Sequence, residues 1–188
     1  MYRARKFIKN FKLGTHKEVF YEYDLKKPLS KPIISIEPEV RLAEIESFSE
    51  IKKIWNVSQS QFTKRIQSGN SVCFLTYVGP NPIAYHWLQL EGQHFVQKGN
   101  FNFEVEKNVS AIIYHTRVKK EYQGQGLNTY IMWYMLDYCL KKGLQKVWIY
   151  TAADNIAQRK SLEKLGFEFI KSVSSLVVGR KYYSIKSL

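Results

Sequence analysis

The order of hydrophobic and polar residues divides the chain into short segments of two kinds. Runs of β-branched and aromatic residues are typical of strands with buried faces, whereas apolar residues three or four positions apart are typical of helices. The predicted strands cover residues 40–46, 71–77, 83–90, 111–118, 147–151, 167–178 and 181–185, and the predicted helices cover residues 47–55, 60–68, 127–142 and 155–165. Residues 19–23 alternate weakly like a strand, and residues 101–105 suit either a strand or a substrate loop.

Turn residues indicate how these elements connect. The sequence Gly-Pro-Asn-Pro at 79–82 joins two predicted strands and favours a hairpin, and Gly179 favours a second hairpin near the end of the chain. Strand 111–118, helix 127–142 and strand 147–151 have the order of a right-handed parallel crossover. The sequence therefore predicts an α+β fold with a mixed, mostly antiparallel sheet and flanking helices.

The chain has 188 residues, which suffices for one domain with a full core. Prolines at 28, 32 and 38 interrupt the pattern, so we expect residues 1–32 to form a basic extension and residues 33–188 to form a single domain. The first 18 residues are rich in Lys and Arg around a few apolar positions. They suit either an amphipathic helix on an anionic surface or a solvated leader.

Charge and cysteine content narrow the class of protein. Lys and Arg outnumber Asp and Glu by 29 to 16, and the net charge of +13 favours an anionic partner such as a phosphate-bearing cofactor, an acidic protein, RNA or a membrane surface. Cys73 and Cys139 lie in apolar segments without metal-ligand spacing, so we expect neither a disulfide nor a metal site. No apolar run is long enough to cross a bilayer, and we expect a cytoplasmic protein.

Gly124 and Gly126 lie between a predicted buried strand and a predicted helix. Such a loop leaves backbone N–H groups unpaired at the positive end of the helix dipole, where they bind phosphate. No GxxxxGK sequence occurs, which excludes a P-loop. A dinucleotide fingerprint would need a third glycine where Thr129 stands and an acidic residue about twenty positions on, and Asp154 comes too late.

Gln123, Gly126 and Asn128 fit a third pattern: Gln or Arg, two residues, Gly, one residue, then Gly or Ala. This pattern resembles the coenzyme A loop of the GNAT superfamily of N-acyltransferases. Asn155 and the string RKSLEKLGF further along resemble the second signature of that family. The resemblance covers about a third of the chain, from Ser110 to Phe167.

The resemblance implies a GNAT-like sheet with a central strand-loop-helix-strand unit that binds coenzyme A. It also implies transfer of an acetyl or other acyl group from coenzyme A to a primary amine by direct attack in a ternary complex. The pantetheine arm would pair with the strand that ends at Val118, and a backbone N–H there would stabilise the oxyanion. The implied cofactor-binding residues are Arg117, Val118, Gln123, Gly124, Gln125, Gly126, Leu127, Asn128, Thr129, Asn155 and Lys160.

Two positions depart from the family pattern. Asn128 stands where Gly or Ala is usual, so the helix is expected to sit slightly further from the pyrophosphate. Leu162 stands where many members carry a tyrosine thought to protonate the leaving thiolate, and leucine cannot donate a proton. That acid is therefore either missing or located elsewhere.

The amine acceptor must lose a proton, so a base is expected within reach. The candidates are His115, Tyr114, Glu104 and His86. His115 has the most suitable ordinary pKa, but strand alternation puts Tyr114 and His115 on opposite faces, and a bulge would reverse either choice. His16 and His94 are expected at the surface.

Two other functions remain open from the sequence. One is an acyltransferase whose donor is an acyl carrier protein. The other is a non-catalytic basic module that binds RNA or an acidic surface, which would show steep salt dependence. The residues identify neither the amine acceptor nor the oligomeric state.

Overall fold

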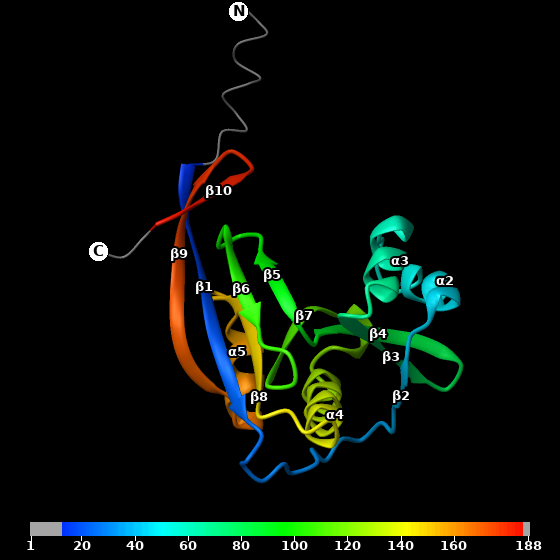
Figure 1. Ribbon diagram of the computed structural model, residues 1–188. Helices are drawn as coiled ribbons and strands as arrows, with labels where there is room; N and C mark the ends of the chain where they lie inside the picture. The colour runs from blue at the N-terminus through cyan, green and yellow to red at the C-terminus, as the bar shows by residue number, and fades with distance from the viewer. Residues whose placement is uncertain (1–12, 186–188) are drawn as a thin grey trace, which may run out of the picture.

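The computed structural model describes residues 13–185, which form an eight-stranded sheet, a two-stranded sheet and helices on both faces of the larger sheet (Figure 1). The order of the larger sheet is β10-β9-β1-β8-β7-β4-β3-β2. The strands are β1 (Leu13–Asp24), β2 (Glu39–Leu42), β3 (Ser71–Val78), β4 (Asn81–Gln89), β5 (Gly92–Val96), β6 (Phe101–Val105), β7 (Ser110–Val118), β8 (Lys146–Ala152), β9 (Glu168–Val178) and β10 (Lys181–Ser184). The helices are α2 (Phe48–Lys52), α3 (Gln59–Gln67), α4 (Leu127–Lys141) and α5 (Ile156–Leu165), with short 3-10 turns η1 (Ile45–Ser47) and η2 (Lys120–Tyr122).

Within residues 13–185, neighbouring strands of the larger sheet pair antiparallel except β7 and β8, which run parallel. Helix α4 connects those two strands, as the crossover pattern predicted. The α+β fold with a mixed, mostly antiparallel sheet is therefore confirmed. The predicted β3–β4 and β9–β10 hairpins are both present.

Strand β1 lies between β8 and β9 in the middle of the sheet, where we had expected part of a basic extension over residues 1–32. Its alternation is weak because both faces are buried: Tyr21 and Tyr23 pack on one face, and Phe20 packs on the other. A domain boundary after residue 32 would therefore separate β1 from the sheet to which it belongs. Most of the predicted N-terminal amphipathic segment falls on residues 1–12, outside the described part of the chain.

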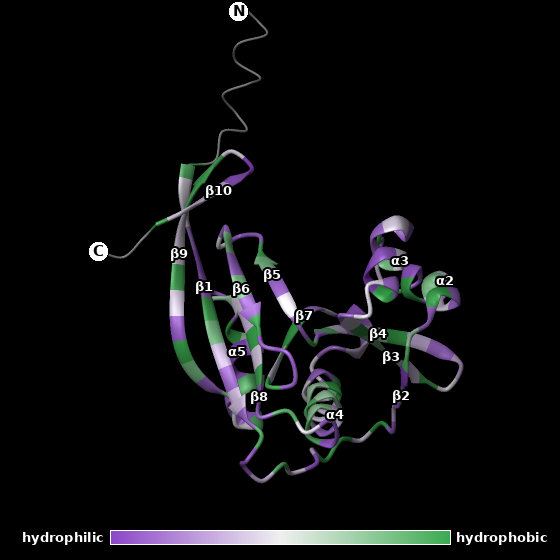
Figure 2. Cartoon of the chain, in the orientation of Figure 1, coloured by the Kyte–Doolittle hydropathy of each residue, from purple (hydrophilic) through white to green (hydrophobic). Residues whose placement is uncertain are grey.

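The two faces of the sheet have different covers. Helices α4 and α5 pack on one face, where Ile131, Met135 and Leu162 join the larger core cluster, and hydrophobic residues recur along the whole of α4 (Figure 2). On the other face, α2 and α3 cover β3 and β4 through Ile51 and Phe62. None of the helices in residues 13–185 is long and apolar enough to cross a membrane.

The hairpin of β5 and β6 covers the remaining part of that second face, next to β8 and β1 (Figure 1). Phe101 and Phe103 lie with their ring centroids 5.6 and 5.9 Å from that of Phe20. Residues 101–105 are thus a strand, which settles the alternative left open by the sequence. Its partner β5 was missed because Gly92, Gln93 and His94 do not read as an apolar run.

We expect Leu162→Ala to lower the free energy of unfolding by about 2 to 5 kcal/mol, because it leaves a cavity in a closed core. Leu162 has no exposed surface and belongs to the larger core cluster. Ile156 lies on the same helix and is 50% exposed, so Ile156→Ala is the matched control and should change stability by well under 1 kcal/mol. Urea unfolding of both variants tests this, and equal losses would contradict the packing described here.

Candidate active site

Strands β7 and β8 separate part-way along their length. They pair in parallel from Ser110 with Lys146 to Ile113 with Ile149, and there the ladder ends. From Tyr114 to Val118, the edge of β7 that faces β8 has no strand partner in the described part of the chain. The strand edge that the family resemblance assigned to the pantetheine arm is therefore free of a strand partner here.

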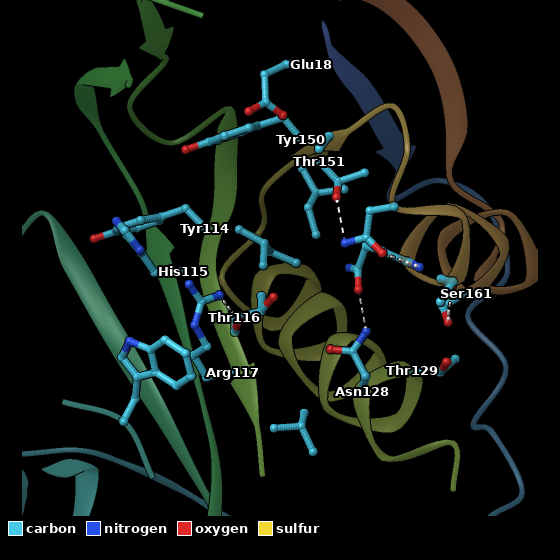
Figure 3. A pocket seen from close by; sticks show the side chains of 18 of the residues that line it. Glu18, Tyr114, His115, Thr116, Arg117, Asn128, Thr129, Tyr150, Thr151 and Ser161 are labelled. Carbon is cyan, nitrogen blue, oxygen red and sulfur yellow. Dashed lines mark hydrogen bonds between the residues drawn. The ribbon is translucent and has the colours of Figure 1, made fainter. Parts of the chain in front are cut away.

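A cleft of about 1360 Å³ fills the opening between the two strands. Its walls include Leu127 and Ala157 from the α4 and α5 side of the sheet, and Arg65 and His94 from the opposite side. Figure 3 shows the cleft with Asn128 and Thr129 at one end and Tyr150 and Glu18 at the other. The cleft is therefore open to both sides of the sheet.

A β-bulge lies on β7 beside the opening. Tyr114 pairs with Trp87 and Arg117 pairs with Tyr85, so two residues of β7 lie opposite His86 alone. His115, the first of those two, has φ 47°, which is a strained backbone conformation for a residue other than glycine. Both residues line the cleft, but Tyr114 is buried against the core under α3, whereas His115 is exposed.

The glycine loop closes the other end of the cleft. Gly126 is the N-cap of α4 with φ 78°, and a Cβ atom there would lie 2.9 Å from the Ile34 side chain. Because a glycine N-cap has no side chain, it leaves the first N–H groups of α4 without a side-chain acceptor. Gln123 holds the loop by donating from Nε2 to the Val118 carbonyl at 3.0 Å. Free N–H groups at a helix N-terminus suit a phosphate group.

Most of the predicted cofactor-binding residues line this cleft. They are Arg117, Val118, Gln123, Gly124, Gly126, Leu127, Asn128, Thr129 and Asn155. Gln125 is outside the wall and donates to the Glu121 carbonyl instead. Lys160 is exposed and also outside the wall, because the face of α5 that lines the cleft carries Ser161 and Lys164. Those two predictions are not supported as cofactor contacts.

Asn128 links the two sides of the opening. Its Oδ1 accepts from His86 Nε2 at 2.9 Å, and its Nδ2 donates to Gln158 Oε1 at 2.9 Å. His86 has no exposed surface, and burial lowers its pKa to about 4. His86 is therefore inaccessible to ligands and positions Asn128. Because position 128 carries Asn instead of Gly or Ala, α4 is hydrogen-bonded to both β4 and α5.

The predicted bases differ in their access to the cleft. Tyr114 is buried, donates to Ser71 Oγ at 3.2 Å, and has its pKa raised by burial. Glu104 is exposed on β6, contacts Gln93 and is not among the residues that line the cleft. His115 lines the cleft, but desolvation and then the charges of Arg65 and Arg117 lower its pKa to about 4.

Two cleft residues escaped the sequence analysis. His94, expected at the surface, is 6% exposed; its Nδ1 lies 2.9 Å from Gln89 Oε1 and its Nε2 lies 3.1 Å from the Tyr150 hydroxyl. Burial first, and then the charges of His115 and Arg65, lower the pKa of His94 to about 4. Glu18 is 4% exposed and lines the same cleft. His16 is half-buried and contacts Glu18 with Nε2 2.9 Å from Oε1, so it is not a free surface residue.

A signal for Glu18 was present in the sequence but depended on recognising β1. Glu18 and Phe20 are two positions apart and therefore share a face of that strand. An acidic residue beside a buried aromatic residue on one face would have marked a polar position next to the core. No comparable pattern marks His94, which folds into the site through the β5–β6 hairpin.

Comparison with known protein families agrees with the resemblance found in the sequence. The model of the acetyltransferase (GNAT) family matches residues 40–167. The chain belongs to this family. GNAT proteins transfer acyl groups and generally use acetyl-CoA, and the matched segment contains the opened strands, the glycine loop and both signatures. No curated protein matches the chain significantly.

Several solved structures resemble the fold at low sequence identity. A GCN5-related N-acetyltransferase from Sphaerobacter thermophilus has a TM-score of 0.65 and is 10% identical over 96% of this chain and 57% of its own. An acetyltransferase of the GNAT family from Colwellia psychrerythraea has a TM-score of 0.60 and is 15% identical over 99% of this chain and 62% of its own. A functionally unknown conserved protein from Staphylococcus epidermidis has a TM-score of 0.63 and is 12% identical over 94% and 65%. This GNAT chain thus spans less than two thirds of each of these neighbours.

Proposed function

We propose that this protein transfers an acyl group, in the simplest case acetyl, from coenzyme A to a primary amine. The observation that carries the proposal is the continuity of the unpaired edge of β7 with the uncapped N-terminus of α4 in one cleft. A strand edge suits the amide groups of a pantetheine arm, and a helix N-terminus suits a pyrophosphate. Amines are the general acceptors of the family.

Specific residues would hold each part of acetyl-CoA. The backbone around Gly124 and Gly126 would bind the pyrophosphate, and the β7 edge from Tyr114 to Val118 would pair with pantetheine. Arg117 and Lys164 add positive charge to the cleft wall. Arg117 is also ordered by the Trp55 ring, whose centroid lies 4.9 Å from its guanidinium carbon.

The cysteines favour direct attack over a covalent acyl-enzyme. Both Cys73 and Cys139 are fully buried. Burial raises the pKa of the Cys139 thiol to about 12 and raises that of Cys73 as well. A nucleophilic cysteine needs an accessible thiolate, so the amine itself is the nucleophile in our proposal.

The absence of the family tyrosine at position 162 is compatible with this reaction. Leu162 has no exposed surface and faces the core, so nothing at that position reaches the cleft. An ordinary thiol has a pKa of about 8.5, which makes a thiolate a good leaving group near neutral pH without a dedicated acid. The thioester supplies an activated acyl group, and the chain has to bind it, exclude water and remove the proton of the amine.

Acetyl-CoA should raise the melting temperature by about 5 to 10 °C at a hundred times its dissociation constant, since binding there adds about 2.7 kcal/mol. Dephospho-coenzyme A, NAD and tRNA serve as comparators in the same thermal unfolding experiment. Amine-dependent release of free thiol then tests transfer. A shift with tRNA and none with acetyl-CoA would reject the proposal in favour of a basic binding module, and transfer only from an acylated carrier protein would replace the donor.

A further inference from the structure

The cleft has one acidic side chain among the described residues of its wall. Arg65, Lys98, Arg117 and Lys164 supply positive charge, and Glu18 is the only carboxylate. Glu18 comes from β1, on the side of the sheet opposite α4 and α5, beside Tyr150 (Figure 3). Glu18 is distant in the chain from the glycine loop and both family signatures.

The Glu18 carboxylate is buried with half of its hydrogen-bonding capacity unused. Oε1 lies 2.9 Å from His16 Nε2, whereas Oε2 is buried and has no hydrogen-bond partner in residues 13–185. A buried acceptor without a partner is costly, more so when it carries charge. Figure 3 shows the carboxylate directed into the cleft above the Tyr150 ring. A ligand with N–H groups would satisfy the free oxygen.

The neighbouring Tyr150 hydroxyl has a fixed hydrogen-bond direction. Gln89 Nε2 donates to the carbonyls of Glu91, Gly92 and Gln93, so its Oε1 is left to accept from His94 Nδ1. His94 Nε2 is therefore the unprotonated nitrogen of a neutral ring, and the Tyr150 hydroxyl donates to it at 3.1 Å.

The remaining lone pairs of the Tyr150 oxygen can then only accept hydrogen bonds. Burial, and then the charge of Glu18, raise the pKa of Tyr150, which keeps the phenol protonated. Because the phenol hydrogen is already donated to His94, the Tyr150 oxygen can bind only a ligand group that donates a hydrogen bond. Primary ammonium and amine groups are such donors.

We propose that Glu18 and Tyr150 form the binding site for the amine acceptor, and that Glu18 is the base that takes its proton. This assignment rests on the proposed acyl transfer. The ammonium gives one proton to the Glu18 carboxylate, directly or through water, and becomes a neutral amine. Its lone pair forms the new C–N bond, the C–S bond breaks, and the second proton of the nitrogen goes to the departing thiolate. Glu18 returns its proton to solvent through His16.

A structural role and the proposed catalytic role of Glu18 predict different effects of Glu18→Gln on the melting temperature. If the contact with His16 holds β1 in place, Glu18→Gln should lower the melting temperature. In the proposed role, replacing an under-partnered buried carboxylate by a neutral amide leaves the melting temperature unchanged or higher. Tyr150→Phe removes the oxygen that accepts from the amine and keeps the ring that packs on Phe20, with centroids 5.4 Å apart.

The kinetic test compares Glu18→Gln, Tyr150→Phe and His115→Ala with wild type, using acetyl-CoA with n-butylamine and glycinamide as acceptors. We expect Glu18→Gln to lower kcat/KM at least a hundredfold, Tyr150→Phe to raise KM about tenfold, and His115→Ala to lower kcat/KM less than tenfold. The thermal shift with acetyl-CoA should be unchanged in all three variants. A hundredfold loss in His115→Ala with an active Glu18→Gln would overturn the proposal and make His115 the base.

A binding test separates failure of this assignment from failure of the proposed function. In the presence of coenzyme A, n-butylammonium chloride should raise the melting temperature of the wild type above that seen with equal sodium chloride, and it should not do so for Glu18→Gln. Equal shifts in both proteins, or none in either, would overturn the ammonium site even if acetyl-CoA binds. Loss of the acetyl-CoA shift in the wild type would instead reject the donor.

Discussion

Gly126→Val is expected to reduce acetyl-CoA affinity at least a hundredfold while leaving the domain folded. Gly126 has φ 78°, where an L-residue costs about 1 to 2 kcal/mol, and its Cβ would lie 2.9 Å from Ile34 Cγ2. Either the Ile34 side chain or the loop backbone must therefore shift, next to the point where the first N–H groups of α4 face the cleft.

Gly143→Val is the matched control for that substitution. Gly143 has φ 74°, so it carries the same backbone penalty, but a Cβ there meets nothing within 4 Å and the residue does not line the cleft. Gly143→Val should lose about 1 to 2 kcal/mol of unfolding free energy and Gly126→Val at least as much, and only Gly126→Val should lose the ligand. Isothermal titration with acetyl-CoA measures the difference, and equal affinity in the two variants would show that the loop does not hold the cofactor.

Local signals in the sequence were sufficient to predict the part of the site that we assign to the acyl donor. The glycines, the apolar strand before them and the helix after them lie within one stretch from Ser110 to Lys141. A strand, a loop and a helix that are contiguous in sequence must also be adjacent in space. Eight of the nine predicted cofactor residues in this stretch line the cleft for that reason. Gln125 and Lys160 lie outside the cleft wall, and local sequence signals do not determine which way a side chain points.

The acceptor half could not be predicted in the same way because its residues come from distant strands. Glu18 on β1, His94 on β5 and Tyr150 on β8 meet only after the sheet has assembled in an order unrelated to the sequence. The β-bulge at His115 is similarly a property of the pairing between β4 and β7. Alternation alone left both faces open for Tyr114 and His115, and in the structure both residues line the cleft.

The burial of histidines has a consequence for stability that the sequence did not indicate. The unfolded chain protonates histidine near pH 6.5, whereas burial lowers the pKa of His86 and His94 in the folded protein to about 4. Below pH 6.5 the unfolded state therefore binds more protons than the folded state, and stability falls as the pH falls toward 4. His86 is fully buried and His94 is 6% exposed, so solvent does little to reduce the effect.

When the pH is lowered from 7.5 to 5, we expect protonation of each of these two histidines in the unfolded state to lower the unfolding free energy by about 2 kcal/mol, or by about 4 kcal/mol together. Most carboxylates stay ionised over this range, so the slope reports mainly on histidine. His86→Gln retains an N–H donor for Asn128 Oδ1 and does not titrate, and His94→Asn does the same for Gln89 Oε1. Urea unfolding at each pH should show that either variant removes about 2 kcal/mol of the wild-type loss and that the double variant removes about 4 kcal/mol. The loss that remains in the double variant should be the smaller contribution of His115, whose pKa is also lowered but whose side chain is exposed to solvent. A double variant with the full wild-type loss would mean that other groups destabilise the protein in acid, and that these histidines already titrate normally in the folded state.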